Sequence, residues 1–281
     1  ILIHALPIYH THGLFVATNV SLLAGSSIIL MRKFNTDAIC SRMPQASVLM
    51  GVPTFYVRLL EHHDLSNATK KMRLFVSGSA PMLPQIHDLW KKRTGQAILE
   101  RYGMTETSMN TSNPYLGERR SGTAGIALPG IEVIVTDPLT GKVLQNGRTG
   151  MIEIRGPNVF KGYWGMPKKT AEELRQNGFF ITGDLGKISK DGYVSLIGRS
   201  NDLIISAGYN IYPKEIELLL DRIEGVFESA VIGVPHPDLG EAVVALIVTE
   251  SGVSLNLEFI MAALQKGIAH FKHPKQIIFI G

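Results

Sequence analysis

The chain has 281 residues, of which 45% are hydrophobic and 19% are charged. This composition excludes an intrinsically disordered protein, and the length suffices for one large or two smaller domains. The net charge of +4 comes from a small excess of basic residues that are not gathered into one long run. We therefore expect no nucleic-acid-binding surface.

Cysteine content and hydrophobic patterning indicate where the protein works. Cys40 is the single cysteine, so no internal disulfide can form, which favours a reducing compartment such as the cytoplasm. The longest apolar stretch, residues 14–31, is interrupted by polar residues too often to form a membrane span. Both ends of the sequence lie in strand-like runs, so we expect a fragment of a longer protein. A mitochondrial matrix location stays open if a targeting segment has been lost.

Residues 1–122 alternate short apolar runs with amphipathic stretches. This alternation predicts a partial α/β domain with a largely parallel sheet. The expected strands cover residues 1–8, 26–31, 46–52, 72–79 and 97–103, and the expected helices cover residues 54–63 and 84–95.

The pattern changes after Gly122. Residues 123–199 contain β runs punctuated by glycine and proline, which predicts a small β-rich subdomain with strands at 131–138, 150–157 and 193–198. Residues 200–281 return to a βαβ-like pattern, which predicts a small α+β domain. Its strands are expected at 202–208, 228–235, 242–249 and 275–280, and its helices at 214–223 and 256–268.

The run ERYGMTETSMN, residues 100–110, is the densest chemical motif. A predicted strand ends there at Tyr102 and Gly103, and Thr105 and Glu106 follow at the carboxyl edge of the sheet, where open α/β folds bind ligands. A hydroxyl beside a carboxylate can hold phosphate oxygens and Mg²⁺ together. The alternative is the start of a helix, with Thr105 as its N-cap and Glu106 in its first turn.

Small residues at a second strand end and two later polar residues suggest further parts of a nucleotide site. Ser77, Gly78, Ser79 and Ala80 would let a flat ligand approach the backbone, although a plain βα turn has the same composition. We expect Asp184 in a turn between glycines, where an aspartate usually bonds its own backbone, and Arg199 at a domain junction. An acid for ribose hydroxyls and a base at that junction would complete the site.

Six ordered motifs carry a resemblance to a known family: LPIYHTHG, SGSAP, YGMTET, TGD, GRSNDLIISAGYNIYPKEIE and VIGVPHPDLGE. Together they span nearly the whole chain. The sequence resembles the adenylate-forming enzymes, which include acyl-CoA synthetases, luciferases and peptide-synthetase adenylation domains. Within that superfamily it is most similar to the malonyl-CoA synthetases, through runs such as MGVPTFYVRLL and GPNVFKGYWGMP.

The resemblance implies an acid–thiol ligase that uses ATP, Mg²⁺ and coenzyme A. A carboxylate attacks the α-phosphate of ATP to give an acyl-adenylate and pyrophosphate, and the thiol of coenzyme A then displaces AMP. Both steps need positioning and charge neutralisation more than covalent help from the protein.

The resemblance also implies site residues. Thr105, Glu106 and His10 would be catalytic, with Thr105 on phosphate, Glu106 on Mg²⁺ and His10 beside the reacting carboxylate. Tyr102 would stack on adenine, Gly78 to Ala80 would line its pocket, and Asp184 and Arg199 would bind the ribose. The residues expected to bind ATP or coenzyme A are Ser77, Gly78, Ser79, Ala80, Tyr102, Gly103, Thr105, Asp184, Arg199 and Gly208.

A dicarboxylate such as malonate keeps one carboxylate ionised in the pocket, and such a charge needs a cation. By the resemblance, Arg58 and Arg119 would bind this distal carboxylate. A site of this kind should reject acetate and long fatty acids, because an empty pocket leaves guanidinium groups unpaired. The alternatives are that Arg58 lies on a solvated helix face beside Glu61, and that Arg120 acts in place of Arg119.

The resemblance places a hinge at Asn201 and part of the pantetheine channel at Gly208, although the hinge is usually Asp or Lys. Two other parts of the family pattern, a glycine-rich phosphate loop and a downstream catalytic lysine, are missing. We therefore expect these 281 residues alone to bind nucleotide weakly and to form little or no thioester. We also expect an uncovered apolar face at residues 21–30.

Three other functions remain to be distinguished. The first is an acyl- or aryl-CoA synthetase of the same superfamily, in which Arg58 and Arg119 are surface residues. The second is a non-catalytic nucleotide-binding remnant, against which the intact Thr105, Glu106 and Asp184 count. The weakest is a nicotinamide dehydrogenase, because no G-x-G-x-x-G motif follows a strand.

Overall fold

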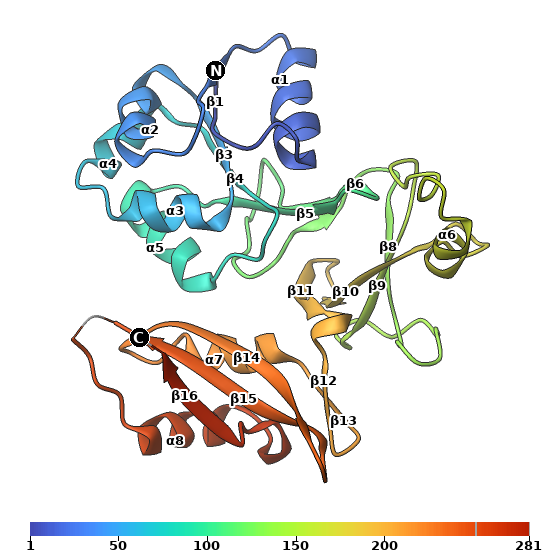
Figure 1. Cartoon of the computed structure of the whole chain (residues 1–281). Helices are drawn as coiled ribbons and strands as arrows, with labels where there is room; N and C mark the ends of the chain where they lie inside the picture. The colour runs from blue at the N-terminus through green and yellow to red at the C-terminus, as the bar shows by residue number, and fades with distance from the viewer. Residues whose placement is uncertain (251, 281) are drawn as a thin grey trace. The chain divides into compact units, whose positions relative to one another are not determined.

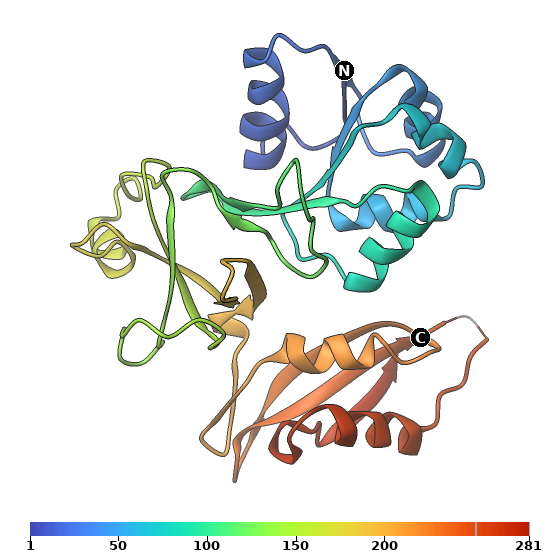
Figure 2. The ribbon, with the colours of Figure 1, turned by 180° about the vertical axis from the view of Figure 1, so that it is seen from behind.

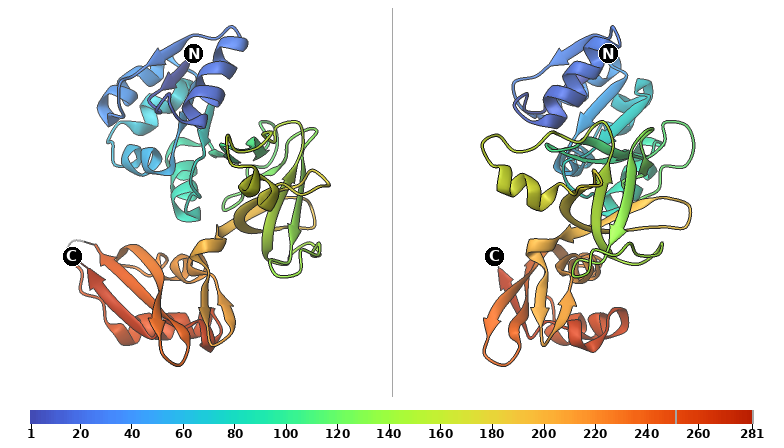
Figure 3. Two further views of the ribbon diagram at one scale, coloured as in Figure 1. Left: turned by 45° about the vertical axis from the view of Figure 1, so that its right-hand side comes forward. Right: turned by 90° about the vertical axis from the view of Figure 1, so that its right-hand side faces the viewer.

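The computed structural model describes residues 1–250 and 252–280. The chain forms two compact units (Figure 1). Unit 1 comprises residues 1–182 and 187–196, and unit 2 comprises residues 183–186 and those from 197 onward. Figure 3 gives two further views in which the elements of each unit can be followed.

A seven-stranded mixed sheet forms the first part of unit 1, in the order β2-β1-β3-β4-β5-β6-β7. Strands β1 to β5 are paired in parallel, whereas β6 and β7 are antiparallel additions. The predicted α/β class with a largely parallel sheet is confirmed. The strand bounds are β1 Leu2–His4, β2 Ile28–Leu30, β3 Val48–Gly51, β4 Leu74–Ser77, β5 Leu99–Met104, β6 Ser108–Ser112 and β7 Ile126–Ala127.

Helices cover both faces of this sheet: α2 to α5 lie on one face and η1 with α1 on the other (Figures 1 and 2). The longest, α5, begins with a proline that suits a first helical turn and ends at Gly95, whose φ of +77° a glycine adopts without strain. The helices are η1 His12–Asn19, α1 Val20–Leu23, α2 Thr36–Arg42, η2 Met43–Gln45, α3 Pro53–Leu60, α4 Leu65–Ala68, η3 Thr69–Lys71 and α5 Pro84–Thr94.

The core between the sheet and α3 and α5 is built from aromatic side chains. Trp90 of α5 is fully buried, and its ring lies edge-on to Tyr56 of α3 and to Phe75 of β4, with both centroid distances at 4.9 Å. The Tyr56 hydroxyl donates to the carbonyl of Val76 at 2.6 Å. This packing anchors α3 and α5 to β4 close to its carboxyl end, next to the residues that follow it.

A second sheet follows, in the order β11-β10-β9-β8, with helix α6 beside it. Its elements are β8 Glu132–Thr136, β9 Gly150–Arg155, α6 Pro167–Glu173, β10 Phe180–Ile188 and β11 Val194–Arg199. The turn predicted around Asp184 is wrong, because Asp184 lies inside β10. Gly183 keeps a φ of +73° within the strand, so the glycines bend the strand and do not end it.

Unit 2 contains a five-stranded sheet packed against two helices, the α+β arrangement that the sequence predicts. The strand order is β13-β12-β15-β14, and β16 pairs in parallel with β15. The elements are η4 Ser200–Asp202, β12 Ile204–Ser206, β13 Tyr209–Ile211, α7 Pro213–Leu220, β14 Val226–His236, β15 Gly240–Thr249, α8 Leu257–Gly267, η5 His270–Lys272 and β16 Gln276–Ile280.

Two observations concern apolar surface. Around the segment predicted to be uncovered, Leu22, Leu23 and Leu30 are 62%, 89% and 66% exposed. Among the described residues, no helix is long and apolar enough to cross a membrane.

Candidate active site

The segments that follow β1 and β4 meet the carboxyl-terminal half of β5 and the neighbouring strand β6, and together they line one pocket at the carboxyl edge of the parallel strands. This is the edge at which open α/β sheets bind ligands. Of the predicted residues, His10, Gly78, Ser79 and Gly103 line this pocket, and Thr105 lies beside it, with its Oγ1 3.5 Å from Thr11 Oγ1. The complete lining is His10, Thr11, His12, Gly78, Ser79, Arg101, Gly103, Met104 and Met109.

His12 is a pocket residue that sequence reasoning did not select. Its side chain is buried, its Nδ1 lies 3.1 Å from Ser79 Oγ, and its Nε2 is buried without a partner. Burial, assisted by the charge of Arg101, lowers the pKa of His12 to about 3. His12 is therefore a neutral imidazole with one ring nitrogen available to a ligand.

Arg101 is the second residue that sequence reasoning missed. It lies on β5, and its Nη1 donates to the thioether of Met109 at 3.1 Å. Its Nε and Nη2 are buried without hydrogen-bond partners. Burial lowers the pKa of Arg101 to about 10, so the group stays charged at neutral pH. A buried cation with two unsatisfied donors favours an anionic ligand, because burying an unpaired charge is costly.

Thr105 and Glu106 lie in the tight turn between β5 and β6. The alternative reading of this run as the start of a helix is wrong, because the chain reverses directly into an antiparallel strand. The Glu106 carbonyl accepts from the Phe160 N–H at 2.8 Å, and Glu106 Oε1 lies 3.1 Å from the Tyr163 hydroxyl. Glu106 is half-buried, whereas Thr105 is exposed.

These oxygen donors suit Mg²⁺, which commonly takes one or two carboxylates together with substrate phosphates. Among the described residues, no group of three or more histidine, cysteine or acidic side chains is arranged to hold a metal alone. A cation at Glu106 would therefore take its remaining ligands from phosphate oxygens and water. A hard, phosphate-bound ion fits this arrangement, whereas an ion held only by protein groups does not.

Glu100 precedes Arg101 on β5 and is only 7% exposed. Burial raises the pKa of Glu100 to about 8, against the opposing effect of the backbone N–H groups of Met82 and Gly122. It pairs in register with Ser77 of β4, whose hydroxyl is buried without a partner. Because successive side chains of a strand point to opposite faces, Glu100 and Tyr102 share one face of β5 and Arg101 lies on the other.

Two predicted residues also have structural roles here. Tyr102 is 6% exposed and belongs to a hydrophobic cluster with Ala124, Ile152, Ile154 and Val194. A Cβ at Gly103 would lie 1.9 Å from the carbonyl oxygen of Ser108, so the β5–β6 turn requires glycine at this position.

The two arginines predicted to bind the distal carboxylate lie in different settings. Arg58 is exposed on α3, with its guanidinium 5.8 Å from the centre of the Phe34 ring, and within the described residues it makes no ion pair with Glu61. Arg119 donates to the carbonyl of Ala97 at 2.7 Å and to that of Tyr115 at 3.1 Å. Ala97 precedes β5, so Arg119 lies at the opposite end of this strand from the pocket, and its position argues against the predicted role.

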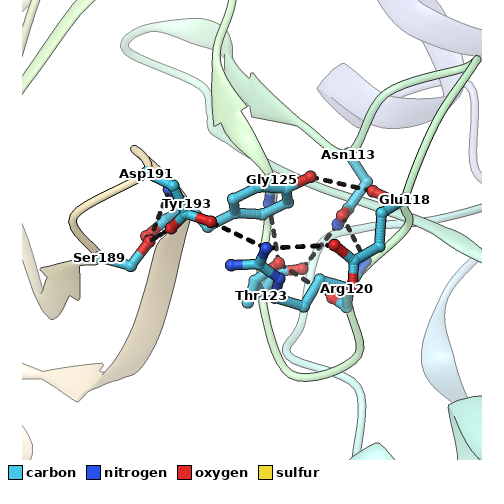
Figure 4. Close-up of polar contacts among 8 residues, drawn as sticks. All are labelled: Asn113, Glu118, Arg120, Thr123, Gly125, Ser189, Asp191 and Tyr193. Carbon is cyan, nitrogen blue, oxygen red and sulfur yellow. Dashed lines mark hydrogen bonds and ion pairs between the residues drawn. The ribbon is translucent and has the colours of Figure 1, made fainter.

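The alternative, Arg120, is also engaged elsewhere (Figure 4). Its guanidinium pairs with Asp191 at 2.8 Å and with Glu118 at 3.2 Å, and it lies over the ring of Tyr193 at 3.9 Å. These contacts join residues 113–125 to the turn between β10 and β11. The same loop supplies the Gly122 N–H that faces Glu100, so Arg120 supports the site from outside it.

The remaining predicted residues belong to unit 2. Arg199 Nε lies 2.8 Å from Asp184 Oδ1, so the two residues expected to bind ribose are neighbours, with Asp184 buried and Arg199 exposed. Asn201 lies in η4. Gly208 lies in the β12–β13 turn, where Ala207 and Gly208 both have positive φ. The proposed roles of these residues, like that of Ala80 in the segment after β4, stay predictions.

Adenylate-forming enzymes have a largely parallel α/β sheet that binds ligands at its carboxyl edge, a β-rich part and a small α+β unit. The chain has all three parts. The chain belongs to the AMP-binding enzyme family, whose pattern it matches over residues 1–164. Residues 215–281 match the C-terminal domain of AMP-binding enzymes. The predicted membership of the adenylate-forming superfamily is confirmed.

Relatives and solved structures agree with this assignment. The chain is 58% identical to the ATP-bound crystal structure of MatB from Rhodopseudomonas palustris, with a TM-score of 0.97 over 99% of this chain and 56% of that one. It is 33% identical to a malonate–CoA ligase from Arabidopsis thaliana and 35% identical to a probable CoA ligase, CCL8, from Humulus lupulus. Each alignment covers 98% of this chain, which spans about half the length of these curated relatives.

Proposed function

We propose that the protein carrying this chain is an ATP-dependent acid–thiol ligase that forms malonyl-CoA. Malonate would attack the α-phosphate of ATP to give malonyl-adenylate and pyrophosphate, and coenzyme A would then displace AMP. Family membership supports the adenylate-forming chemistry, and similarity to MatB and to a malonate–CoA ligase supports malonate as the acid. The buried thiol of Cys40 suits a reducing compartment, either the cytoplasm or the mitochondrial matrix.

The observation that favours a dicarboxylate is the buried guanidinium of Arg101. The apolar tail of a fatty acid or an aromatic acid would leave this buried cation and its two unsatisfied donors unpaired, which costs free energy. A second carboxylate would pair with that cation, and each charge-assisted hydrogen bond contributes about 1.5–3 kcal/mol. Arg101 therefore takes, in this proposal, the role that the sequence predicts for Arg119.

The two faces of β5 separate the two substrates in this proposal. Tyr102 and Glu100 share the face assigned to the nucleotide, and Arg101 lies on the face assigned to malonate. His10 and His12 line the pocket beside Arg101, and the neutral His12 can hydrogen-bond a carboxylate oxygen without adding charge. The exposed Arg58 remains a proposed contact of the carboxylate.

The nucleotide contacts in this proposal rest on the family resemblance. Thr105 would bind phosphate and Glu106 would hold Mg²⁺, which when bound offsets the negative charge of the phosphates. Gly78 lies against Arg101 and His12, on the face assigned to malonate, so in this proposal its lack of a side chain makes room for the acid. In unit 2, Asp184 and Arg199 would bind the ribose, with Asn201 as hinge and Gly208 beside coenzyme A.

A substrate panel tests the proposal. The full-length protein would be assayed for pyrophosphate release with malonate, acetate, octanoate and ferulate at equal concentrations, with and without coenzyme A. We expect kcat/KM for malonate to exceed that for acetate by at least about 100-fold, because acetate leaves Arg101 unpaired. Equal or better use of octanoate or ferulate would contradict the malonate assignment, and release with no acid would contradict the ligase reaction.

A further inference from the structure

The segment that follows β9 contacts the turn that carries Glu106. The Phe160 N–H donates to the Glu106 carbonyl at 2.8 Å, and the ring of Tyr163 packs edge-on against Phe160 with centroids 4.8 Å apart. Phe160 in turn packs edge-on against Phe180 of β10, at 5.3 Å. The ring of Tyr163 is therefore held by edge-on aromatic contacts, with its hydroxyl beside the Glu106 side chain.

The Tyr163 hydroxyl lies between two carboxylates. It is 3.1 Å from Glu106 Oε1 and 2.7 Å from Glu173 Oε2. A phenol has one hydrogen, so it can donate to only one of these oxygens at a time. A phenol keeps its proton at neutral pH, so the Tyr163 hydroxyl acts as a donor here.

Lys169 determines how the two carboxylates compete for that hydrogen. Its Nζ lies 2.5 Å from Glu173 Oε1, one helical turn away on α6. The phenol lies closer to Glu173 than to Glu106, but the ammonium of Lys169 offsets the charge of Glu173. Because Lys169 already compensates the charge of Glu173, Glu106 remains a strong acceptor for the phenol.

From this geometry we propose that Tyr163 is a positioning residue that orients the carboxylate of Glu106 toward Mg²⁺. The phenol holds Oε1, and among the described residues Oε2 of Glu106 has no hydrogen-bond partner, so this oxygen is available to a cation. Lys169 and Glu173 support the phenol from the other side. The inference rests on the proposed role of Glu106 in the ligase reaction.

Partners of metal ligands typically change metal affinity by about 10- to 100-fold when removed. Tyr163→Phe keeps the aromatic stack and removes the hydroxyl. In the full-length protein we expect it to raise the Mg²⁺ concentration for half-maximal pyrophosphate release by about 10- to 100-fold, with KM for malonate unchanged. A binding readout accompanies activity: the gain in Tm from ATP with Mg²⁺, compared with ATP and EDTA, should shrink in this variant.

Glu173→Gln is the matched control, because it removes a carboxylate from the same phenol and leaves the hydrogen to Glu106. We expect its half-saturating Mg²⁺ concentration to stay within about twofold of the parent. If Glu173→Gln weakened Mg²⁺ as much as Tyr163→Phe, the phenol would only anchor the segment to α6 and the inference would be overturned. Should Tyr163→Phe fail to fold, Lys169→Met provides the test, because an uncompensated Glu173 should take the hydrogen and weaken Mg²⁺ binding.

Glu106→Gln separates this inference from the function on which it rests. We expect that variant to lose the Mg²⁺-dependent part of the ATP-induced Tm gain. If it does and Tyr163→Phe behaves like the parent, the positioning role alone is wrong. If Glu106→Gln leaves Mg²⁺ dependence unchanged, the proposed metal role of Glu106 fails, and the positioning role fails with it.

Discussion

Glu100→Gln offers a sharp test of the electrostatics inside the sheet. Glu100 is buried on β5, and burial raises its pKa from 4.5 to about 8. In the unfolded chain the carboxyl ionises near its ordinary value, so between these two pKa values the folded state binds more protons than the unfolded state. Stability contributed by this group is therefore present at pH 4 and lost as the pH rises toward 8.

The magnitude follows from the shift. Each pKa unit corresponds to about 1.4 kcal/mol, so the full difference is on the order of 4–5 kcal/mol by pH 8. Glutamine has the same shape and does not ionise, which removes this pH dependence. The variant should match the parent within about 1 kcal/mol at pH 5 and exceed its stability by several kcal/mol at pH 8.

Urea unfolding at pH 5, 6, 7 and 8 measures the difference. Trp90 is fully buried in the unit that holds Glu100, so its fluorescence reports the unfolding of that unit. Trp164 is already 99% exposed in the folded protein, so its fluorescence should change little. A stability difference between variant and parent that did not change with pH would refute the account of Glu100 as a buried, protonated acid.

Three further substitutions probe particular contacts. Arg175→Ala should destabilise unit 1 by about 3–5 kcal/mol in urea unfolding, because it leaves the buried carboxylate of Glu153 without the guanidinium that binds it at 2.6 and 2.7 Å. A loss under about 1 kcal/mol would contradict this. Ala207→Gly should stabilise unit 2 by about 1 kcal/mol, since Ala207 has a φ of +49°; a lower Tm would argue against strain there. Gly103→Ala should cost about 3 kcal/mol and weaken ATP-induced Tm gain, because its Cβ would meet the Ser108 carbonyl; a Tm equal to the parent's would refute that packing.

The regular elements were the predictable part of this fold. The apolar runs of residues 1–122 gave the parallel strands, and the helix expected at 84–95 is α5, Pro84–Thr94, because a proline and a glycine mark its ends. The turn expected at Asp184 failed because glycine is ambiguous: it ends some strands and bends others, and β10 passes through Gly183. The alternative of Thr105 as a helix N-cap is wrong because the chain turns back at this point and pairs as β6. The local sequence does not show this pairing.

The pocket residues were partly predictable. Motif spacing selected His10, Gly78 and Ser79, which line one pocket. Arg101 was missed because a single charged residue in a strand does not reveal which face it occupies. A signal was nevertheless present: the apolar run around ILERYG predicts a buried strand, and a buried arginine needs an anion. The sequence alone does not show whether Arg101 or Arg119 faces the pocket. Arg119 turns out to bind backbone carbonyls, and these contacts exist only in the folded loop.

The central claim, that Arg101 binds the second carboxylate of malonate, is tested most directly by Arg101→Met in the full-length protein, with Arg119→Met as control. The account predicts that Arg101→Met lowers kcat/KM for malonate by at least about 100-fold, equivalent to about 3 kcal/mol, while the Tm gain from ATP is kept. Arg119→Met should leave kcat/KM within about threefold of the parent. Unchanged malonate use by Arg101→Met would contradict the claim.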